Sequence, residues 1–278
     1  MPELPEVETI KNALATAVCG SNIIQILINH NQLRQKIPSD FADVIVGAKI
    51  SSCRRKAKYI LLDLDNGISI IWHLGMSGRI IISEQKPKMQ KHDHVVIETS
   101  RGWITYNDAR RFGLLTYCNT QELSENKLFK NVGIEPFDEA LTGAYLFEKI
   151  KGKKVPIKTV LLDQKVVNGI GNIYASEILF ESRISPLRRA DKITIAECDV
   201  LVEKIRKVLN KAIAAGGSTL KDYQKPDGSL GYFQNLHCVY NKTGQRCEGC
   251  TCDVSQTGGV RKIVQAGRSS FYCPVKQV

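Results

Sequence analysis

The first residues of the chain could supply a nucleophile with proton donors beside it. Proline in second place, Pro2, permits removal of Met1 and would leave a secondary amine at the start of the chain. A free N-terminal amine has an ordinary pKa of about 7.7–8.0, so part of it is neutral and nucleophilic at physiological pH. A secondary amine that attacks a sugar C1′ carbon gives an iminium directly. Glu3 and Glu6 lie within one helical turn of that nitrogen, where carboxylates could transfer protons.

The same segment also suits the start of a helix that has no catalytic role. Pro5 favours a first helical turn, and the acidic residues favour the positive end of a helix. Taken alone, the segment favours this structural interpretation, so the choice depends on the rest of the chain.

The cysteines form a second group with possible chemistry. Of the nine cysteines, five crowd into the C-terminal tail: Cys238, Cys247, Cys250, Cys252 and Cys273. The other four are scattered in apolar contexts, where a reduced cysteine is a small core residue. In a reducing compartment the crowded cysteines predict a metal site.

The net charge points to a polyanionic partner. The formal charge is +11, which favours nucleic acid over an acidic or neutral partner. We find no run of about 18 apolar residues and no basic amphipathic anchor, so we expect no membrane association. The N-terminus lacks the basic and then apolar stretch of a signal peptide, and we expect a cytoplasmic protein.

The residues around these groups predict the elements that position them. Val7, Ile10, Leu14 and Ala17 recur at helical spacing and predict an N-terminal helix that Gly20 would end. From residue 22 to 118, short β-rich runs alternate with turns and predict a β-sandwich. The runs include residues 23–28, 59–64, 68–73, 95–98 and 112–117.

The second half of the chain has a different pattern. Helical spacing predicts helices over residues 145–151, 157–162, 173–181 and 195–215. Thr194 and Glu197 are in capping-box register before the last of these, and Gly216 and Gly217 would end it. The runs 260–264 and 269–272 predict the two strands of a C-terminal hairpin.

Together these patterns predict an α+β fold in four parts. They are an N-terminal β-sandwich with flanking helices over residues 1–123, a linker over 124–144, a helical domain over 145–231 and a Cys-rich β-hairpin over 232–278.

Eight motifs, in the same order, resemble those of the bacterial formamidopyrimidine-DNA glycosylase family. They are PELPE at 2–6, RRKAKY at 54–59, HLGMSG at 73–78, KHDH at 91–94, DARRFG at 108–113, NGIGNIY at 168–174, GYF at 231–233 and AGR at 266–268. The resemblance extends from Met1 to about Pro274. It implies a helix-two-turn-helix domain, a zinc-finger hairpin, and excision of oxidised purines from duplex DNA followed by strand cleavage.

The resemblance implies roles for the catalytic residues. Pro2 matches the proline that forms a Schiff base with C1′ of the damaged nucleotide, and Glu3 matches the proton donor. Lys58 matches the lysine that serves β-elimination, and Arg268 matches the arginine that assists δ-elimination. Glu6 is expected to contact the substrate. The remaining cations at 54–56 are expected to add only to the positive field.

A base that is processed must leave the stack, and a side chain must fill the gap that it leaves. Met76, Arg110 and Phe112 match the family's intercalating residues. Met and Phe can replace stacking contacts, and Arg can hydrogen-bond the orphaned partner base. His92, Arg110, Lys153 and Asn172 match positions that contact the DNA backbone. The loop at 218–223 resembles the one that closes over the extruded base.

The C-terminal hairpin departs from the family's zinc finger. Family members have two Cys-x-x-Cys pairs, and Cys247 and Cys250 form the first pair here. In the second pair Cys273 is followed by Lys276, where the fourth cysteine belongs. We expect one Zn²⁺ per chain held by these three thiolates, with Cys252 as the candidate fourth ligand. The alternatives are that another group supplies the fourth ligand or that the metal has been lost.

Two alternatives remain open at this point. One is an enzyme of the sister family, endonuclease VIII, which takes oxidised pyrimidines; Leu4 speaks against it, since that family usually has Gly there. The other is a DNA-binding finger protein without catalysis, which would not need Pro2, Glu3 and Lys58 together. We expect the protein to act as a monomer on damaged double-stranded DNA.

Overall fold

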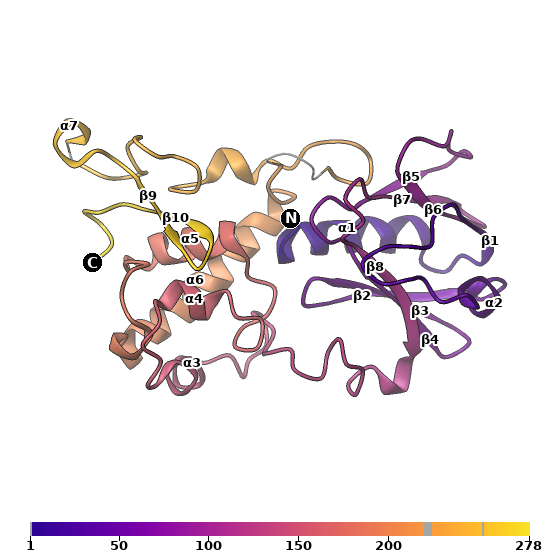
Figure 1. Ribbon diagram of the computed structural model, residues 1–278, viewed down its shortest axis with the longest axis horizontal. Helices are drawn as coiled ribbons and strands as arrows, with labels where there is room; N and C mark the ends of the chain where they lie inside the picture. Colours follow the sequence, from indigo (N-terminus) through magenta and orange to yellow (C-terminus); the bar gives the residue numbers. More distant parts are fainter. Residues whose placement is uncertain (1, 220–223, 252) are drawn as a thin grey trace. The chain divides into compact units, whose positions relative to one another are not determined.

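The computed structural model describes residues 2–219, 224–251 and 253–278 (Figure 1). The chain forms two compact units. The first consists of residues 1–131 and 212–234, and the second of residues 132–211 and 235–278. The first break in the chain, at 131/132, falls inside the predicted linker. The four-part division into 1–123, 124–144, 145–231 and 232–278 stays a prediction.

The first unit begins with helix α1, Leu4–Val18. Glu3 and Glu6 close a capping box at its start, and proline stands in its first turn. At its other end Gly20 has a φ of 84°, a conformation that glycine adopts without steric cost. The predicted N-terminal helix is confirmed.

Two four-stranded antiparallel sheets make up most of the first unit. One has the order β1-β6-β7-β5 and the other the order β2-β3-β4-β8. Their strands are β1 Ile23–Ile28, β2 Ile50–Lys56, β3 Tyr59–Leu64, β4 Ile68–His73, β5 Arg79–Ser83, β6 Asp93–Thr99, β7 Gly102–Asn107 and β8 Leu114–Asn119. The short helix α2, Phe41–Ile45, connects β1 to β2.

One hydrophobic core joins both sheets to α1. It buries Val7, Ile10 and Leu14 from the helix together with Trp72 and Tyr106 from the two sheets. The two aromatic rings meet edge to face with centroids 5.2 Å apart. This core fixes α1, and therefore the start of the chain, against the sheets; α1 runs beside the strands in Figure 1.

The second unit is mainly helical. Its helices are α3 Gly143–Ile150, α4 Ile157–Leu161, α5 Asn172–Glu181, α7 Val254–Thr257 and the greater part of α6, Ile195–Ala214. It also contains the 3-10 helix Ala190–Lys192, whereas Thr120–Glu122 belongs to the first unit and Phe233–Leu236 spans residues of both.

The predicted ends of α6 are confirmed. At its start the Thr194 N–H donates to Glu197 Oε2 at 2.8 Å, and the Glu197 N–H donates to Thr194 Oγ1 at 3.3 Å. At its end Gly216 and Gly217 have φ values of 74° and 78°, which favour glycine.

The C-terminal hairpin pairs β9, Arg261–Gln265, with β10, Arg268–Tyr272. Its two-residue turn, Ala266 and Gly267, has positive φ at both positions, as a type I′ turn requires. Within this unit β10 packs on α5, as Figure 1 shows. The hairpin therefore presents Arg268 directly after its tip.

One predicted strand began too early. The run 112–117 was expected to be a strand from Phe112 onward, but β8 begins at Leu114. Phe112 lies in the preceding loop, where Arg111 has a φ of 56° that interrupts extended backbone. Burial in the sheet therefore does not explain why residue 112 is a phenylalanine. Among the described residues, no helix is long and apolar enough to span a membrane.

Candidate functional site

The start of the chain is buried in the first unit and held by a carboxylate. Pro2, Glu3 and Glu6 are all buried. Glu6 Oε2 accepts the Glu3 N–H at 2.8 Å, and its Oε1 accepts the Ser218 N–H at 2.7 Å. Glu6 thus joins the first turn of α1 to the segment that leads into the predicted 218–223 loop.

The contact with Glu6 leaves no room for a side chain at Gly217. A Cβ there would lie 2.8 Å from Glu6 Oε1, and the φ of 78° would itself be strained for other residues. Ser218 is therefore fixed where the predicted loop begins. Residues 220–223 of that loop lie outside the described residues.

Lys58 is buried in the turn between β2 and β3. The residue before it, Ala57, has a φ of 53°, and its carbonyl accepts from the Arg55 guanidinium at 2.9 Å. Arg55 also pairs with Glu8 of α1 at 2.7 Å. Burial, with Arg34 and Lys58 as cationic neighbours, lowers the pKa of His73 to about 4. Lys58 therefore lies near a histidine that stays neutral at physiological pH.

The three predicted wedge residues are brought together on two neighbouring turns of the first unit. Met76 is 38% exposed and Phe112 is 46% exposed, which is unusual for large apolar side chains. The Arg110 guanidinium lies over the Phe112 ring at 4.7 Å from its centroid. A Cβ at Gly75 would lie only 2.4 Å from the Phe112 carbonyl carbon, so the two turns are in direct backbone contact.

The backbone of His92 is bonded to the residue that begins the turn of Arg110 and Phe112. Its carbonyl accepts the Asp108 N–H at 3.1 Å, and its ring meets the His94 ring with centroids 6.4 Å apart. It is half-buried and has a φ of 75°.

In the second unit, Asn172 bonds to the strand that carries Arg268. Asn172, the first residue of α5, donates its side-chain amide to the Ser269 carbonyl at 2.9 Å. Ser269 follows the exposed Arg268 on β10. Lys153 is half-buried in the loop after α3, where its carbonyl accepts the Asp191 N–H at 3.0 Å.

Sequence reasoning missed a buried lysine at the same strand. Lys158 of α4 donates to the Ser269 carbonyl at 3.0 Å and to Ser270 Oγ at 2.9 Å. It is buried, whereas a lysine in a helix is usually solvated. Nothing in the sequence distinguishes it from a surface lysine. Its effect is to hold the strand that carries Arg268.

Three of the predicted metal ligands are brought together in the second unit. Cys247, Cys250 and Cys273 are buried, and their thiol sulfurs all lie within 4.8 Å of one another. Cys250 Sγ and Cys273 Sγ are 3.9 Å apart. Sulfurs on a tetrahedral zinc with bonds of about 2.3 Å would lie about 3.8 Å apart, so the cluster could hold a metal. Cys252 lies outside the described residues.

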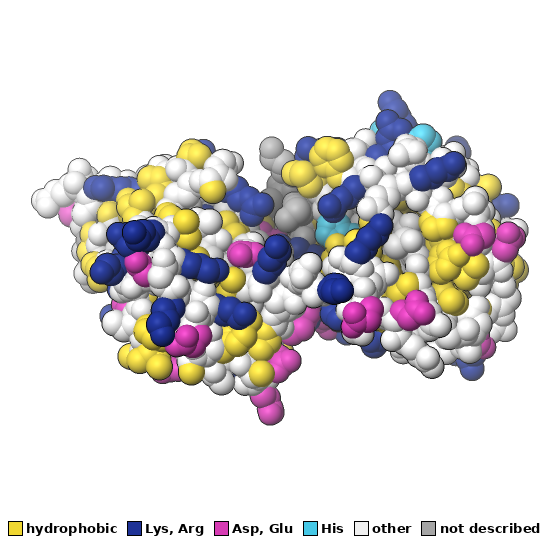
Figure 2. Space-filling model, turned by 60° about the horizontal axis from the view of Figure 1, so that its bottom comes forward, with side chains coloured by type: hydrophobic (Ala, Val, Ile, Leu, Met, Phe, Trp, Pro, Cys, Tyr) yellow, Lys and Arg dark blue, Asp and Glu magenta, His cyan; other side chains and the backbone are white. Residues whose placement is uncertain are grey.

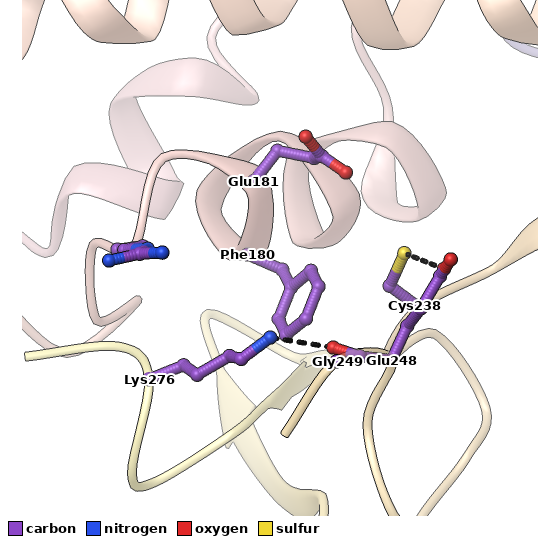
Figure 3. A pocket seen from close by; sticks show the side chains of 7 residues that line it. Phe180, Glu181, Cys238, Glu248, Gly249 and Lys276 are labelled. Atoms are coloured by element: carbon purple, nitrogen blue, oxygen red, sulfur yellow. Dashed lines mark hydrogen bonds between the residues drawn. The ribbon is translucent and has the colours of Figure 1, made fainter. Parts of the chain in front are cut away.

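Lys276, where the resemblance predicts a fourth cysteine, bonds to a backbone carbonyl. The Lys276 side chain extends along a pocket of about 260 Å³. Its Nζ donates to the Glu248 carbonyl at 2.6 Å, as Figure 3 shows. Cys238 Sγ donates to the Glu248 carboxylate at 3.2 Å in the same view. Lys276 thus ties the C-terminal segment to the loop of the first cysteine pair by a hydrogen bond.

The surface carries the positive charge that the composition predicts. Figure 2 shows Lys and Arg side chains distributed over the visible face of both units, with fewer acidic ones among them. Many basic side chains on a surface suit a polyanion.

The chain matches two domain families. The formamidopyrimidine-DNA glycosylase N-terminal domain matches residues 1–115, and the formamidopyrimidine-DNA glycosylase H2TH domain matches residues 132–224. The formamidopyrimidine-DNA glycosylase of Rhodospirillum rubrum is 44% identical over 280 residues, with 100% of both chains covered. That of Jannaschia sp. is 46% identical over 286 residues, again with 100% of both covered.

Solved structures agree with these relatives. A Lactococcus lactis FPG mutant in complex with a Fapy-dG containing DNA has a TM-score of 0.90 and 32% identity, and 99% of each chain is covered. A complex between Lactococcus lactis Fpg and an abasic site containing DNA has a TM-score of 0.89 and 31% identity, with 99% of each covered. This chain therefore belongs to the formamidopyrimidine-DNA glycosylase family and is a DNA glycosylase of base excision repair.

Proposed function

We propose that this enzyme excises oxidised purines, 8-oxoguanine and formamidopyrimidines, through a Schiff base on Pro2 and then cuts the strand by β,δ-elimination. The observation that carries the proposal is the burial of Pro2, Glu3 and Lys58 in one unit. Burying ionisable groups costs free energy, and such groups are commonly kept where chemistry needs them.

The proposed reaction starts at the amine of Pro2. Its lone pair attacks C1′, the bond from C1′ to the base breaks, and the base leaves with that electron pair and takes up a proton. The C1′–O4′ bond opens, Glu3 protonates O4′, and an iminium forms. The Glu3 N–H bond to Glu6 and the Glu6 bond to Ser218 support this role, because they hold the proton donor beside the nucleophile.

Strand cleavage follows from the iminium. Loss of a C2′ proton expels the 3′ phosphate, and a second elimination expels the 5′ phosphate; water then hydrolyses the Schiff base and restores the amine. We assign the first elimination to Lys58 and the second to Arg268. The exposure of Arg268 behind a tight hairpin turn supports contact with DNA.

The DNA contacts are proposed on the same basis. Met76, Arg110 and Phe112 would enter the duplex where the base has left, which suits their exposure and close grouping. His92, Lys153 and Asn172 would bind phosphates. The first turn of α5 offers backbone N–H groups for the same purpose.

Zinc is the metal that the three-cysteine cluster suits best. Buried thiolates at tetrahedral spacing are typical of structural zinc. Cys247, Cys250 and Cys273 would hold the ion, with Cys252 as the proposed fourth ligand. When bound, zinc would clamp the loops around the β9–β10 hairpin. Action as a monomer and a cytoplasmic location remain predictions of the sequence.

Oxidised pyrimidines are a second candidate substrate. A Lactococcus lactis FPG structure with 31% identity and a TM-score of 0.89 is a complex with an oxidized pyrimidine containing DNA. We therefore propose that purine lesions are preferred and that oxidised pyrimidines are excised more slowly.

Single-turnover excision on two duplexes tests the proposal. One duplex carries 8-oxoguanine and the other an oxidised pyrimidine, in the same sequence. We expect faster excision of the purine and products with phosphate at both ends. Lys58→Gln should slow cleavage by about 10²-fold, as loss of an acid–base group does. Lys56→Gln is the matched control, and it should lower the cleavage rate only at high salt, where DNA binding is weak. Faster excision of the pyrimidine would contradict the proposal, and binding without cleavage would favour a finger protein.

A further inference from the structure

The two turns that carry the wedge residues share one buried carboxylate. Asp108 has no exposed surface. Its Oδ1 accepts the Ser77 hydroxyl at 2.6 Å and the Arg110 N–H at 3.3 Å. Its Oδ2 accepts the Gly113 N–H at 2.8 Å and the Tyr106 hydroxyl at 3.1 Å. Asp108 therefore binds the turn of Met76 through Ser77, and the turn of Arg110 and Phe112 through two backbone amides.

Further contacts make the two turns one rigid piece. The Ser77 hydroxyl that donates to Asp108 also accepts the Arg110 N–H at 3.2 Å. A Cβ at Gly113 would lie 1.6 Å from the Tyr106 hydroxyl oxygen, so the turn packs directly against Tyr106 and only glycine fits there. His94 Nε2 lies 2.7 Å from the Asp108 carbonyl oxygen. All of these groups belong to the first unit.

The contacts require a carboxylate at residue 108. Four donors meet its two oxygens, and two of them are backbone N–H groups, which cannot act as acceptors. An asparagine would place its NH₂ group either against the Gly113 N–H or against the Arg110 N–H and the Ser77 hydroxyl. In the first orientation the Gly113 N–H loses this acceptor. In the second the Ser77 hydroxyl loses it and the Arg110 N–H keeps only Ser77 Oγ, so either change shifts the turn or destabilises it.

We infer that Asp108 is a positioning residue for base extrusion: its hydrogen bonds hold Met76, Arg110 and Phe112 in the one arrangement that can fill the gap in the duplex. This inference rests on the proposed wedge role of those three residues. Asp108 itself touches no reacting atom. A displacement of about 1 Å in such supporting groups can cost about 10²-fold in rate.

Asp108→Asn, in the full-length protein, separates extrusion from chemistry. Extrusion is followed by the fluorescence of 2-aminopurine placed opposite 8-oxoguanine. Chemistry is followed by borohydride trapping on an abasic aldehyde in single-stranded DNA, where no base has to leave a stack. We expect a 10- to 100-fold slower fluorescence change and excision, and trapping within about twofold of wild type, since the amine is untouched.

Ser77→Ala and Asp63→Asn complete the test. Ser77→Ala removes one link between the turns and should slow extrusion by less than Asp108→Asn does. It also serves if Asp108→Asn fails to fold. Asp63, which accepts from Ser52, Ser69 and Arg54 on the other sheet, is the matched control, and Asp63→Asn should leave extrusion unchanged.

Three outcomes would overturn the inference. In the first, folded Asp108→Asn extrudes the base at the wild-type rate. In the second, folded Asp108→Asn loses extrusion and trapping to the same extent. In the third, Asp63→Asn slows extrusion as much as Asp108→Asn does. Failure of the proposed function gives a different result, because wild-type protein would then form no trapped adduct at all.

Discussion

Several buried carboxylates of this enzyme hold backbone amides, and three of them show the pattern most clearly. Glu6 accepts from Glu3 and Ser218, and Asp108 accepts from Arg110 and Gly113. Glu177 of α5 accepts three consecutive N–H groups at 238–240, at 2.7–3.0 Å. Each joins a segment of irregular backbone to a helix or a strand. Such bonds fix loops more firmly than exposed ion pairs do, because water does not compete for them.

The depressed pKa of His73 gives a prediction about pH. Unfolded histidine has a pKa near 6.5, and burial lowers that of folded His73 to about 4. Between these values the unfolded chain binds more protons than the folded one, so the free energy of unfolding falls as the pH falls. From pH 7 to pH 5 the loss due to His73 should be about 2 kcal/mol.

Urea unfolding of wild type and His73→Leu at both pH values measures this loss. The variant loses the bond from the Gly75 N–H to His73 Nδ1 and should be less stable at either pH. Its stability should nevertheless depend less on pH. An unchanged difference between pH 7 and pH 5 would show that His73 is not the group responsible.

At the scale of elements, local signals predicted much of the fold. The caps of α1 and α6 and the strands β1, β3 and β4 follow from side-chain type and periodicity alone. Phe112 was the exception, since an exposed wedge and a buried strand residue look the same in a hydrophobic pattern. Its position depends on Arg111, whose positive φ ends the extended backbone before β8 and is not encoded by a hydrophobic pattern.

The candidate site was predictable only in part. Pro2, Glu3 and Lys58 could be named because their types and motifs imply chemistry. The supporting residues could not be assigned roles, because the role of Lys158 depends on Ser269, 111 positions later, and that of Asp108 depends on Ser77, 31 positions earlier. Pairings across such distances are set by the tertiary fold.

The hairpin with its cysteine cluster should depend on metal. We expect purified protein to contain about one zinc ion per chain, measured by inductively coupled plasma mass spectrometry. Cys250→Ser should lose most of it, because a site with one thiolate fewer binds zinc less tightly. Cys118→Ser, a half-buried cysteine of the first unit, is the control and should keep it.

Cys252→Ser addresses the fourth ligand in the same assay. Reduced zinc content would support Cys252 as that ligand. Full zinc content in Cys250→Ser would contradict the assignment of the site to this cluster. Protein purified without metal but fully folded would instead favour Lys276 and its bond to Glu248 as the tether.

At the scale of the whole molecule, the charge of +11 should make DNA binding depend strongly on salt. Each phosphate contact contributes about one unit to the slope of log K against log salt. Lys153→Gln should therefore reduce the slope by about one. Lys204, which pairs with Glu203 at 2.8 Å, is the control, and Lys204→Gln should leave the slope unchanged. Fluorescence anisotropy over a salt series gives both values.

The assignment of Pro2 as the nucleophile is tested most directly by mapping a trapped adduct. Wild-type protein is treated with borohydride on an abasic duplex, digested and analysed by mass spectrometry, and the intact protein is weighed beforehand. The proposed mechanism predicts a mature chain without Met1 and a sugar adduct on the nitrogen of Pro2. A chain that keeps Met1 and still cleaves at full rate, or an adduct on Lys58, would contradict it.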